Sequence, residues 1–359
     1  MPSKNHHQPS ALHALTRQLL MSAGAPRHIA ESIAQALINA NLAGHDSHGV
    51  LHVSTYLSAI DSGAMDPAAE PTVVKETDRT IVLEANKGSG IYLAKRAMEM
   101  AVEKAKQVET CRVSFVRGHH IGRLGEWAEL AARAGCIGII ASGRGGGPNG
   151  GNILPFGGAS GALGTNPLAV GVPTGDDVPF VLDFATSVVA GGKVMVAESL
   201  GVDLPEGSIV DKDGNPSVDP SDVRKGGGLL AFGKHKGYAM SILTCLLGGL
   251  SGDFDTDARS MRGVYMQAMD VEAFLPLDAY QSGVRAFLDG IKATPPAPGF
   301  DEVLVPGDYE HNCRVARLGS GISVPPDVWG RIQACADKLG VSTDEDLTEP
   351  EDLARYTSP

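Results

Sequence analysis

The sequence predicts an α/β fold in which a central mixed sheet is flanked by helices. Near both ends of the chain, apolar residues recur three and four positions apart, which is typical of amphipathic helices. Short runs rich in β-branched residues occupy the middle of the chain and predict strands. We therefore expect the N- and C-terminal segments to form a helical unit that packs against the sheet.

The predicted elements follow in chain order. The helical start covers about residues 10–62, where Leu12, Leu15 and Leu19 share one face. The first strands are expected at 72–74 and 80–83, before a helix that ends near residue 106. Further strands are predicted by short, continuously apolar runs at 112–116, 137–141, 168–172 and 180–182. Such runs are typical of a sheet buried on both faces.

Helices at 126–134, 239–247 and 325–339 complete the predicted elements. The chain is then expected to divide into three parts. Residues 1–75 form a helical segment, residues 76–319 form the α/β domain, and residues 320–359 form C-terminal helices that pack on the first segment.

Composition excludes several classes of partner. The 359 residues carry a formal charge of -12, which repels nucleic-acid backbones and anionic membrane surfaces. Five cysteines form no CxxC pair, and an odd number suits a reducing compartment. No stretch approaches the roughly 20 apolar residues that span a bilayer. These features predict a cytoplasmic protein that binds a small molecule and neither nucleic acid nor membrane.

The common phosphate-binding loops are missing from the sequence, because no GxGxxG opens a helix after a strand and no GxxxxGK[ST] occurs. Four other segments carry the candidate chemistry. In the first, Ser47 and His48 precede His52 and Tyr56, and helical spacing would place 48, 52 and 56 on one face. A histidine there could exchange a proton near neutral pH, although a satisfied surface cluster is an alternative interpretation.

The second segment contains His119, His120 and Arg123, after a predicted strand and before a predicted helix. Loops that leave the carboxyl ends of strands in open α/β sheets commonly bind ligands. The alternative is an ordinary solvated turn at the start of a helix.

The third segment is rich in glycine and runs from Arg144 to Pro173, followed by Leu182–Ser187. Its backbone NH groups could hold a pyrophosphate, and Asp183 could orient a catalytic histidine or cap a helix. The fourth segment contains Lys234 and Lys236 at a glycine-rich helix entry, where a lysine could contact phosphate. Solvated charge is the alternative, and it is favoured for Lys234.

Taken in chain order, these segments resemble the malate/L-lactate dehydrogenase family, which includes ureidoglycolate, sulfolactate and diketogulonate dehydrogenases and piperideine-carboxylate reductases. The motifs are DSHG at 46–49, HxGxxG from His120, PFGG at 155–158 with GTNP at 164–167, D-x-ATS at 183–187, and HKG at 235–237. The resemblance covers about residues 10–340. Five ordered motifs at compatible spacings are more specific than any one alone.

The resemblance implies a non-Rossmann α/β fold, a homodimer, and NAD or NADP as cofactor, with no metal. It also implies hydride transfer between nicotinamide and C2 of a 2-hydroxy acid, a 2-oxo acid or a cyclic imino acid. The catalytic residues carried over are His48, His120 and Asp183, and either histidine could transfer the proton. The expected cofactor contacts are Ser142, Gly164, Thr165, Asn166, Asp183, Ala185, Thr186, Ser187, Lys236, Pro306, Gly307 and Asp308.

Two departures from the family pattern bear on the substrate. The family commonly has an arginine four residues after the DSHG histidine, where this chain has His52. Arg123 or Arg144 could replace it as the carboxylate anchor, and Ser47, His52 and Tyr56 would complete the substrate pocket. The second departure is the glycine-rich stretch 143–151, which is expected to form either a mobile lid or a loose surface loop.

Two other classes of function were weighed. A catalytically inactive relative could bind the cofactor as a scaffold or sensor, and His52 is the best argument for it. A glycine-loop kinase or phosphatase would need a nucleoside triphosphate or metal ligands, and no clustered carboxylates supply such ligands in the sequence.

Overall fold

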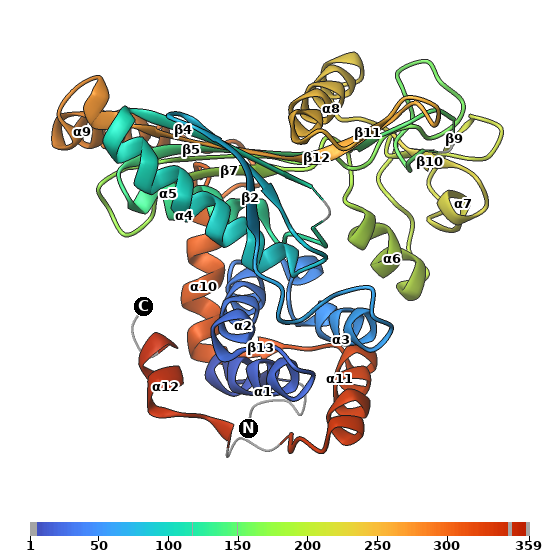
Figure 1. Cartoon of the computed structure of the whole chain (residues 1–359). Coiled ribbons are helices and arrows are strands. Elements are labelled where there is room, and N and C mark those ends of the chain that lie inside the picture. Colours follow the sequence, from blue (N-terminus) through green and yellow to red (C-terminus); the bar gives the residue numbers. More distant parts are fainter. Residues whose placement is uncertain (1–5, 117, 149, 344–346, 357–359) are drawn as a thin grey trace.

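The computed structural model describes residues 6–116, 118–148, 150–343 and 347–356, and Figure 1 shows its layers. The helices of the first half are α1 (Pro9–Ser22), α2 (Arg27–Leu42), α3 (Val53–Asp61), α4 (Gly90–Val108), α5 (Leu124–Arg133) and α6 (Gly191–Leu200). The later helices are α7 (Ser221–Arg224), α8 (His235–Gly248), α9 (Leu277–Lys292), α10 (Asp308–Ser320), α11 (Pro326–Leu339) and α12 (Pro350–Tyr356). Short 3-10 helices cover Asp46–His48, Val50–His52, Gly249–Ser251 and Val271–Ala273.

The main sheet has eight strands, and seven of them follow the order β2-β3-β4-β12-β5-β6-β7, while β11 pairs with β12. Their bounds are β2 (Thr72–Thr77), β3 (Thr80–Glu84), β4 (Thr110–Val116), β5 (Cys136–Gly145), β6 (Leu168–Val172), β7 (Phe180–Phe184), β11 (Phe254–Asp255) and β12 (Ser260–Asp270). Only β3 and β4 pair in parallel, and the other pairs are antiparallel. The predicted mixed sheet is therefore confirmed.

The two faces of the sheet differ in burial. Helices α4 and α5 pack on one face, where Val113, Ile140 and Met266 are fully buried. On the other face, α8 packs on β5 and β12, and residues such as Ile139 and Tyr265 are only half-buried. The expectation of a sheet buried on both faces is thus wrong for this chain alone, because alternate residues of these strands lack a complete second layer of helices.

Helices from the two ends of the chain pack together below the sheet (Figure 1). β1 (His6–His7) pairs with β13 (Ile322–Ser323), and α12 packs on α1. Asp352 of α12 is fully buried, 2.9 Å from His13 Nδ1, and accepts a 2.7 Å hydrogen bond from Arg17. These ionic contacts fix the last helix to the first one.

A second, smaller core lies beside the sheet. It is formed by α6, α8 and the three-stranded sheet of β8 (Ile209–Val210), β9 (Pro216–Ser217) and β10 (Gly228–Leu229), with Ile153, Ile209 and Leu229 almost fully buried. We call this part, residues 151–167 and 185–250, the small lobe. The terminal helices and the sheet share the main core instead. The described residues therefore contain one core that joins the terminal helices to the sheet and a second core in the small lobe.

The sequence missed several elements in the second half of the chain. Strand β12 lies at the centre of the sheet, and α9 and α10 follow it. The glycine-rich stretch begins as strand, since Gly143, Arg144 and Gly145 pair with β12, so this part is neither a lid nor a loose loop. Within the described residues, no helix is long and apolar enough to cross a bilayer.

Candidate active site

Strand register brings the second and third candidate segments to one edge of the sheet. β4 and β5 both run antiparallel to β12, so their carboxyl ends lie at the same edge, with Phe115 and Ser142 on either side of Val264. β7 also ends there, because Phe184 pairs with Leu168, the first residue of β6. The strand ends at this edge carry Arg144 and Asp183, and the loops that follow β4 and β7 carry His120 and Ala185–Ser187. Convergent loops at strand ends are a common place for a binding site.

Three histidines and a tyrosine form a cluster at this edge. The His120 ring lies 5.5 Å from that of His48 and 4.4 Å from that of His52, measured between ring centroids. The Tyr56 hydroxyl is 2.7 Å from His120 Nδ1, and the Ser47 hydroxyl is 3.0 Å from His48 Nδ1. The first and second segments therefore meet, and each of the two candidate bases has a hydroxyl partner.

The local backbone differs from the helix expected for positions 48, 52 and 56. Asp46–His48 and Val50–His52 are separate 3-10 turns with extended Gly49 between them, and α3 begins only at Val53. His52 Nε2 donates to the Ser47 carbonyl, 3.0 Å away, and its ring stacks on Tyr56 with a 12° interplanar angle. The rings still come together, because the His52–Ser47 hydrogen bond and the His52–Tyr56 stacking fold the turn back over the start of α3.

Burial keeps the imidazoles of the cluster neutral. Burial and the nearby His52 ring lower the pKa of His48 from 6.5 to about 4. The pKa values of His52 and His120 are also lowered, chiefly by burial among the other rings, although part of His120 remains open to solvent. Burial raises the pKa of Tyr56, so its hydroxyl stays protonated. At pH 7 the cluster is a set of neutral proton donors and acceptors.

Asp183 contacts the start of α5 instead of a histidine of the cluster. Its Oδ2 accepts a 2.7 Å hydrogen bond from the Gly125 NH and lies 3.8 Å from Arg123 Nε. Burial raises the pKa of Asp183, and Arg123 and the Gly125 NH oppose that rise. The carboxylate thus caps the first turn of α5 from a neighbouring strand.

The two candidate anchor arginines lie in different surroundings. Arg123 is 4% exposed, and its Nε and Nη1 are buried without a hydrogen-bond partner among the described residues. Arg144 is exposed, and its guanidinium makes no ion pair within the part of the chain that the structure describes. Of the two side chains, Arg144 is the one free to bind a carboxylate from solvent.

The third and fourth segments are joined by backbone hydrogen bonds. Thr186 donates from its NH and its hydroxyl to the Thr165 carbonyl, and its own carbonyl accepts from the Phe232 NH at 3.0 Å. Ser187 is 6% exposed, and its buried hydroxyl has no partner among the described residues. Ala185 is half-buried between Phe184 and Thr186. Ser187 therefore has the free polar group in this run.

Other expected cofactor contacts are already engaged. The Asn166 side chain accepts from the Arg144 NH at 2.9 Å and donates to Ser241 Oγ at 2.9 Å. Gly164 packs against the Arg144 side chain, which a Cβ at 164 would approach to 2.7 Å. The Ser142 NH donates to the Pro167 carbonyl at 3.1 Å. These residues shape the loop, and their bonded groups are not free for a ligand.

The HKG segment and residues 306–308 differ in whether their charged groups already have partners. Lys236 is exposed at the start of α8. Asp308 lies 2.9 Å from Lys292 Nζ, Pro306 accepts from the Val181 NH, and Gly307 precedes α10 with a φ of +108°. Lys236 keeps a free charge, whereas Asp308 is already paired.

The small lobe reaches the histidine cluster through α6. A Cβ at Gly192 would lie 2.9 Å from Ser47 Cβ, so only glycine allows this approach. The sequence analysis also missed residues behind the cluster, namely Asn41, His45, Glu310 and Arg317. Only His45, next to DSHG, had a local signal.

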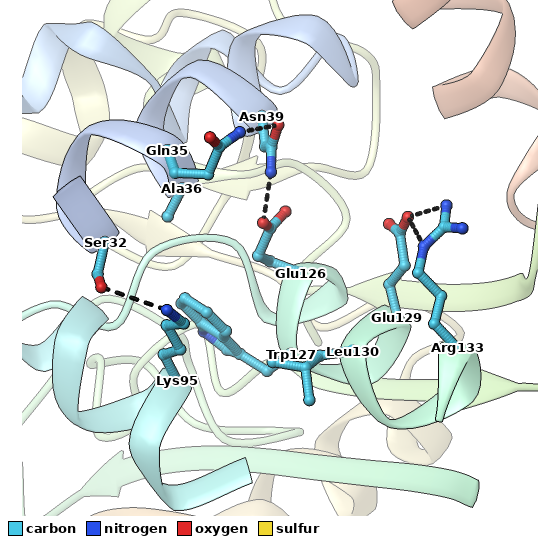
Figure 2. Close-up of a pocket in the computed structure, with 10 residues that line it drawn as sticks. All are labelled: Ser32, Gln35, Ala36, Asn39, Lys95, Glu126, Trp127, Glu129, Leu130 and Arg133. Atoms are coloured by element: carbon cyan, nitrogen blue, oxygen red, sulfur yellow. Dashed lines mark hydrogen bonds and ion pairs between the residues drawn. The ribbon is translucent and has the colours of Figure 1, made fainter. Parts of the chain in front are cut away.

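A hollow of about 270 Å³ lies outside this edge, between α2, α4 and α5 (Figure 2). Its polar side chains are mostly paired with one another: Asn39 donates to Glu126 at 2.7 Å, and Arg133 donates to Glu129 at 2.7 Å. Burial raises the pKa of Glu126. The hollow offers no histidine or hydroxyl pair comparable to that of the cluster.

Comparison with known proteins points to one group. The family model described as malate/L-lactate dehydrogenase matches residues 7–333. The L-lactate dehydrogenase of Cupriavidus necator is 33% identical over 345 residues, which covers 91% of this chain and 96% of that protein.

Solved structures agree with the sequence match. The malate dehydrogenase of Entamoeba histolytica superposes with a TM-score of 0.88 at 26% identity, covering 94% of this chain and 98% of that one. The delta1-piperideine-2-carboxylate reductase of Pseudomonas syringae pv. tomato gives 0.79 at 27% identity, covering 92% and 99%. The likeness extends over nearly the whole chain.

The burial of His48 predicts a specific pH dependence. Because its folded pKa of about 4 lies below the value of 6.5 expected when unfolded, the folded state binds fewer protons between these pH values. Its stabilising contribution is complete above pH 6.5 and is lost as the pH falls toward 4. Ring carbon NMR should show His48 neutral at pH 5.5 in the native protein and titrating near 6.5 in urea. Native titration near 6.5 would contradict the burial argument.

Proposed function

Because the chain belongs to the malate/L-lactate dehydrogenase family, we propose that it transfers a hydride between NAD or NADP and C2 of a small 2-hydroxy or 2-oxo acid, or reduces a cyclic imino acid. The family membership makes it a dehydrogenase or reductase. The observation that supports the chemistry best is the cluster of His48, His52, Tyr56 and His120 at the loop-bearing edge of the sheet.

The proposed proton transfer uses His120 or His48. A neutral imidazole can accept the hydroxyl proton when a 2-hydroxy acid is oxidised, and the imidazolium can return it when a 2-oxo acid is reduced. His120 is favoured, because this residue is exposed whereas His48 is half-buried. To accept the proton at Nε2, His120 must carry its hydrogen on Nδ1 and donate it to the Tyr56 hydroxyl oxygen, 2.7 Å away, and His48 would then bind the substrate oxygen.

The loops beside the cluster suit a dinucleotide. A bound nicotinamide would supply the hydride acceptor or donor. The buried free hydroxyl of Ser187 and the exposed ammonium of Lys236 are the groups that could hold the polar parts of the cofactor. Space remains at the start of α6, where a Cβ at Gly191 would meet nothing within 4 Å.

The substrate carboxylate needs a cation, and His52 is a poor one. Its lowered pKa leaves it neutral at pH 7, and its Nε2 is bonded to Ser47. Arg144 is exposed and unpaired among the described residues, and it follows Ser142 at the same edge of the sheet. We therefore assign the carboxylate to Arg144, with Arg123 as a buried counter-charge for Asp183.

A homodimer is the second part of this proposal. Helix α8 is apolar around its circumference, and Leu243, Leu246 and the following Leu250 are 50%, 56% and 61% exposed. On α6, Met195 and Leu200 are 65% and 69% exposed. Helices that are apolar all round are normally covered. A second copy seated on the small lobe would cover both helices.

A reducing, cytoplasmic location also fits the cysteines. All five are free, and Cys111, Cys136 and Cys245 are buried. Free buried thiols persist where disulfides do not form.

Loss of either candidate base is expected to reduce turnover. His48→Ala and His120→Ala should each lower kcat by roughly 10²- to 10⁴-fold, the usual contribution of a general acid or base. Reduced-cofactor absorbance measures turnover, and protein fluorescence measures cofactor binding, which should not change. His28→Ala is the control, because this side chain is 58% exposed and pairs with Glu70. Full turnover in both variants would refute the mechanism, and cofactor binding by the wild type without turnover of any oxo acid, hydroxy acid or imine would favour an inactive scaffold.

The carboxylate assignment predicts different effects for the two arginines. Arg144→Ala should raise the KM for a 2-oxo acid roughly 10- to 100-fold, since hydrogen bonds to charged groups contribute about 1.5–3 kcal/mol. Arg123→Ala should instead lower the unfolding midpoint in urea, because it leaves Asp183 buried without its cation. Arg133→Ala, whose partner is Glu129, should leave both values unchanged. An unchanged KM in both main variants would mean that neither arginine binds the substrate.

The dimer is tested on the exposed face of α8. Leu246→Glu should convert a dimer into a monomer in sedimentation equilibrium, because a charge in an apolar interface is costly to desolvate. Val74→Glu is the matched control, since Val74 is 65% exposed but lies on β2. A monomeric wild type, or a dimer that survives Leu246→Glu, would contradict this interface.

A further inference from the structure

The turn that carries His48 is held from behind by α10, a helix that follows it by about 260 residues in the sequence. Figure 1 shows α10 running from the sheet down to the terminal helices. Glu310 accepts a 2.9 Å hydrogen bond from His45 Nε2. One and two helical turns further on, Cys313 and Arg317 face the same turn. The side chains of Glu310, Cys313 and Arg317 thus form a continuous stripe along α10 that faces residues 44–46.

Arg317 grips Asp46 with both arms of its guanidinium. Nη1 and Nη2 lie 2.6 and 2.9 Å from the two carboxylate oxygens, and Nη1 also donates to the Asn41 carbonyl. Such a two-pronged pair fixes orientation as well as distance. Cys313 closes the space beside it, because a Cβ at Gly44 would lie 2.9 Å from its sulfur. The beginning of the turn is therefore fixed in direction.

Asn41 fixes both ends of the turn from inside. This residue is 2% exposed, donates to Asp46 Oδ1 at 2.6 Å and accepts from the Val50 NH at 2.9 Å. Gly49 lies directly over its amide, where a Cβ would come within 2.1 Å of Oδ1. Asp46 and Val50 flank His48, so the same side chain holds the backbone before and after it.

His48 itself has few contacts that could position it. The one hydrogen bond described for its ring is the 3.0 Å contact with Ser47, its neighbour in the chain. The placement of the ring consequently depends on the backbone of residues 46–50. A displacement of about 1 Å in a catalytic group can cost about 10²-fold in rate.

We propose that Arg317 and Asn41 are positioning residues for the reaction, acting through Asp46 to hold His48 against His120. This inference rests on the proposed function, because it requires His48 to take part in turnover. It differs from a purely structural role in one respect. Arg317 is 26% exposed and Asp46 is 48% exposed, so their pair adds little to global stability even though it fixes the turn.

The test compares four single variants of the full-length protein. Arg317→Met keeps the length of the side chain and removes its charge, and Arg317→Lys keeps the charge without the fork. Arg314→Met is the matched control, one turn earlier on α10, where the arginine reaches Asn39 and not the turn. His48→Ala reports separately on the proposed function. Turnover, substrate KM, cofactor affinity and melting temperature are measured for each variant.

The expected result for Arg317→Met is a 10- to 100-fold fall in kcat, with KM and cofactor affinity within about twofold of the wild type. Arg317→Lys should recover part of kcat, and Arg314→Met should resemble the wild type. Wild-type kcat in Arg317→Met, or an equal fall in Arg314→Met, would overturn the proposal. A fall in kcat accompanied by loss of cofactor affinity and a large drop in melting temperature would overturn it too.

The His48→Ala variant separates the two claims. If its turnover is lost while Arg317→Met remains fully active, the function stands and the positioning role is wrong. If His48→Ala keeps wild-type turnover, the role proposed for His48 fails, and the positioning proposal fails with it.

Discussion

The antiparallel insertion of β12 between β4 and β5 is the constraint on which the rest of the molecule depends. Six residues of β12 pair with β4 and ten pair with β5, so this strand determines the register of both neighbours. Because β4 and β5 are both antiparallel to β12, they point in the same direction and end at the same edge. Loops that are far apart in the sequence therefore open onto one place.

The remainder of the site follows from that edge. The start of α4 packs under His119 and His120, where a Cβ at Gly90 would lie 2.0 Å from the His119 carbonyl oxygen. On the other side, the carboxylate of Asp183 at the end of β7 caps α5. Both helices lie on the buried face of the sheet, so the core that supports the strands also fixes the loops between them. The loops that carry the histidine cluster are therefore supported by the packed layers beneath them.

Much of this could be predicted from the sequence, and the limits have physical causes. The run 168–172 matches β6 residue for residue, because its short length and apolar side chains are features of the local sequence. The family resemblance placed His48 and His120 in one pocket, and helical spacing placed His52 on the same face as His48. β12 was not predicted, because its central position is decided by partners more than 100 residues away.

The same limit applied inside the site. The Arg317–Asp46 pair joins residues 271 positions apart. Neither the sequence of α10 nor that of the turn contains a local pattern that predicts their contact. Asn166 shows the limit of a local motif in another way. The sequence placed it correctly in a ligand-like glycine loop, but its amide is used up by Arg144, Ser241 and Cys245. A motif identifies a residue's neighbourhood, whereas only the fold shows which of its atoms remain free.

The contacts by which Arg317 and Asn41 restrain the DSHG turn also have a consequence for biosynthesis. Residues 44–50 are synthesised about 260 residues before α10, which restrains them from the other side. A nascent chain can complete the helical pair α1–α2 early, with Asn41 in place, but Arg317 can bind Asp46 only after residue 317 has emerged. The turn that carries His48 therefore gains its full set of restraints long after it has itself been synthesised.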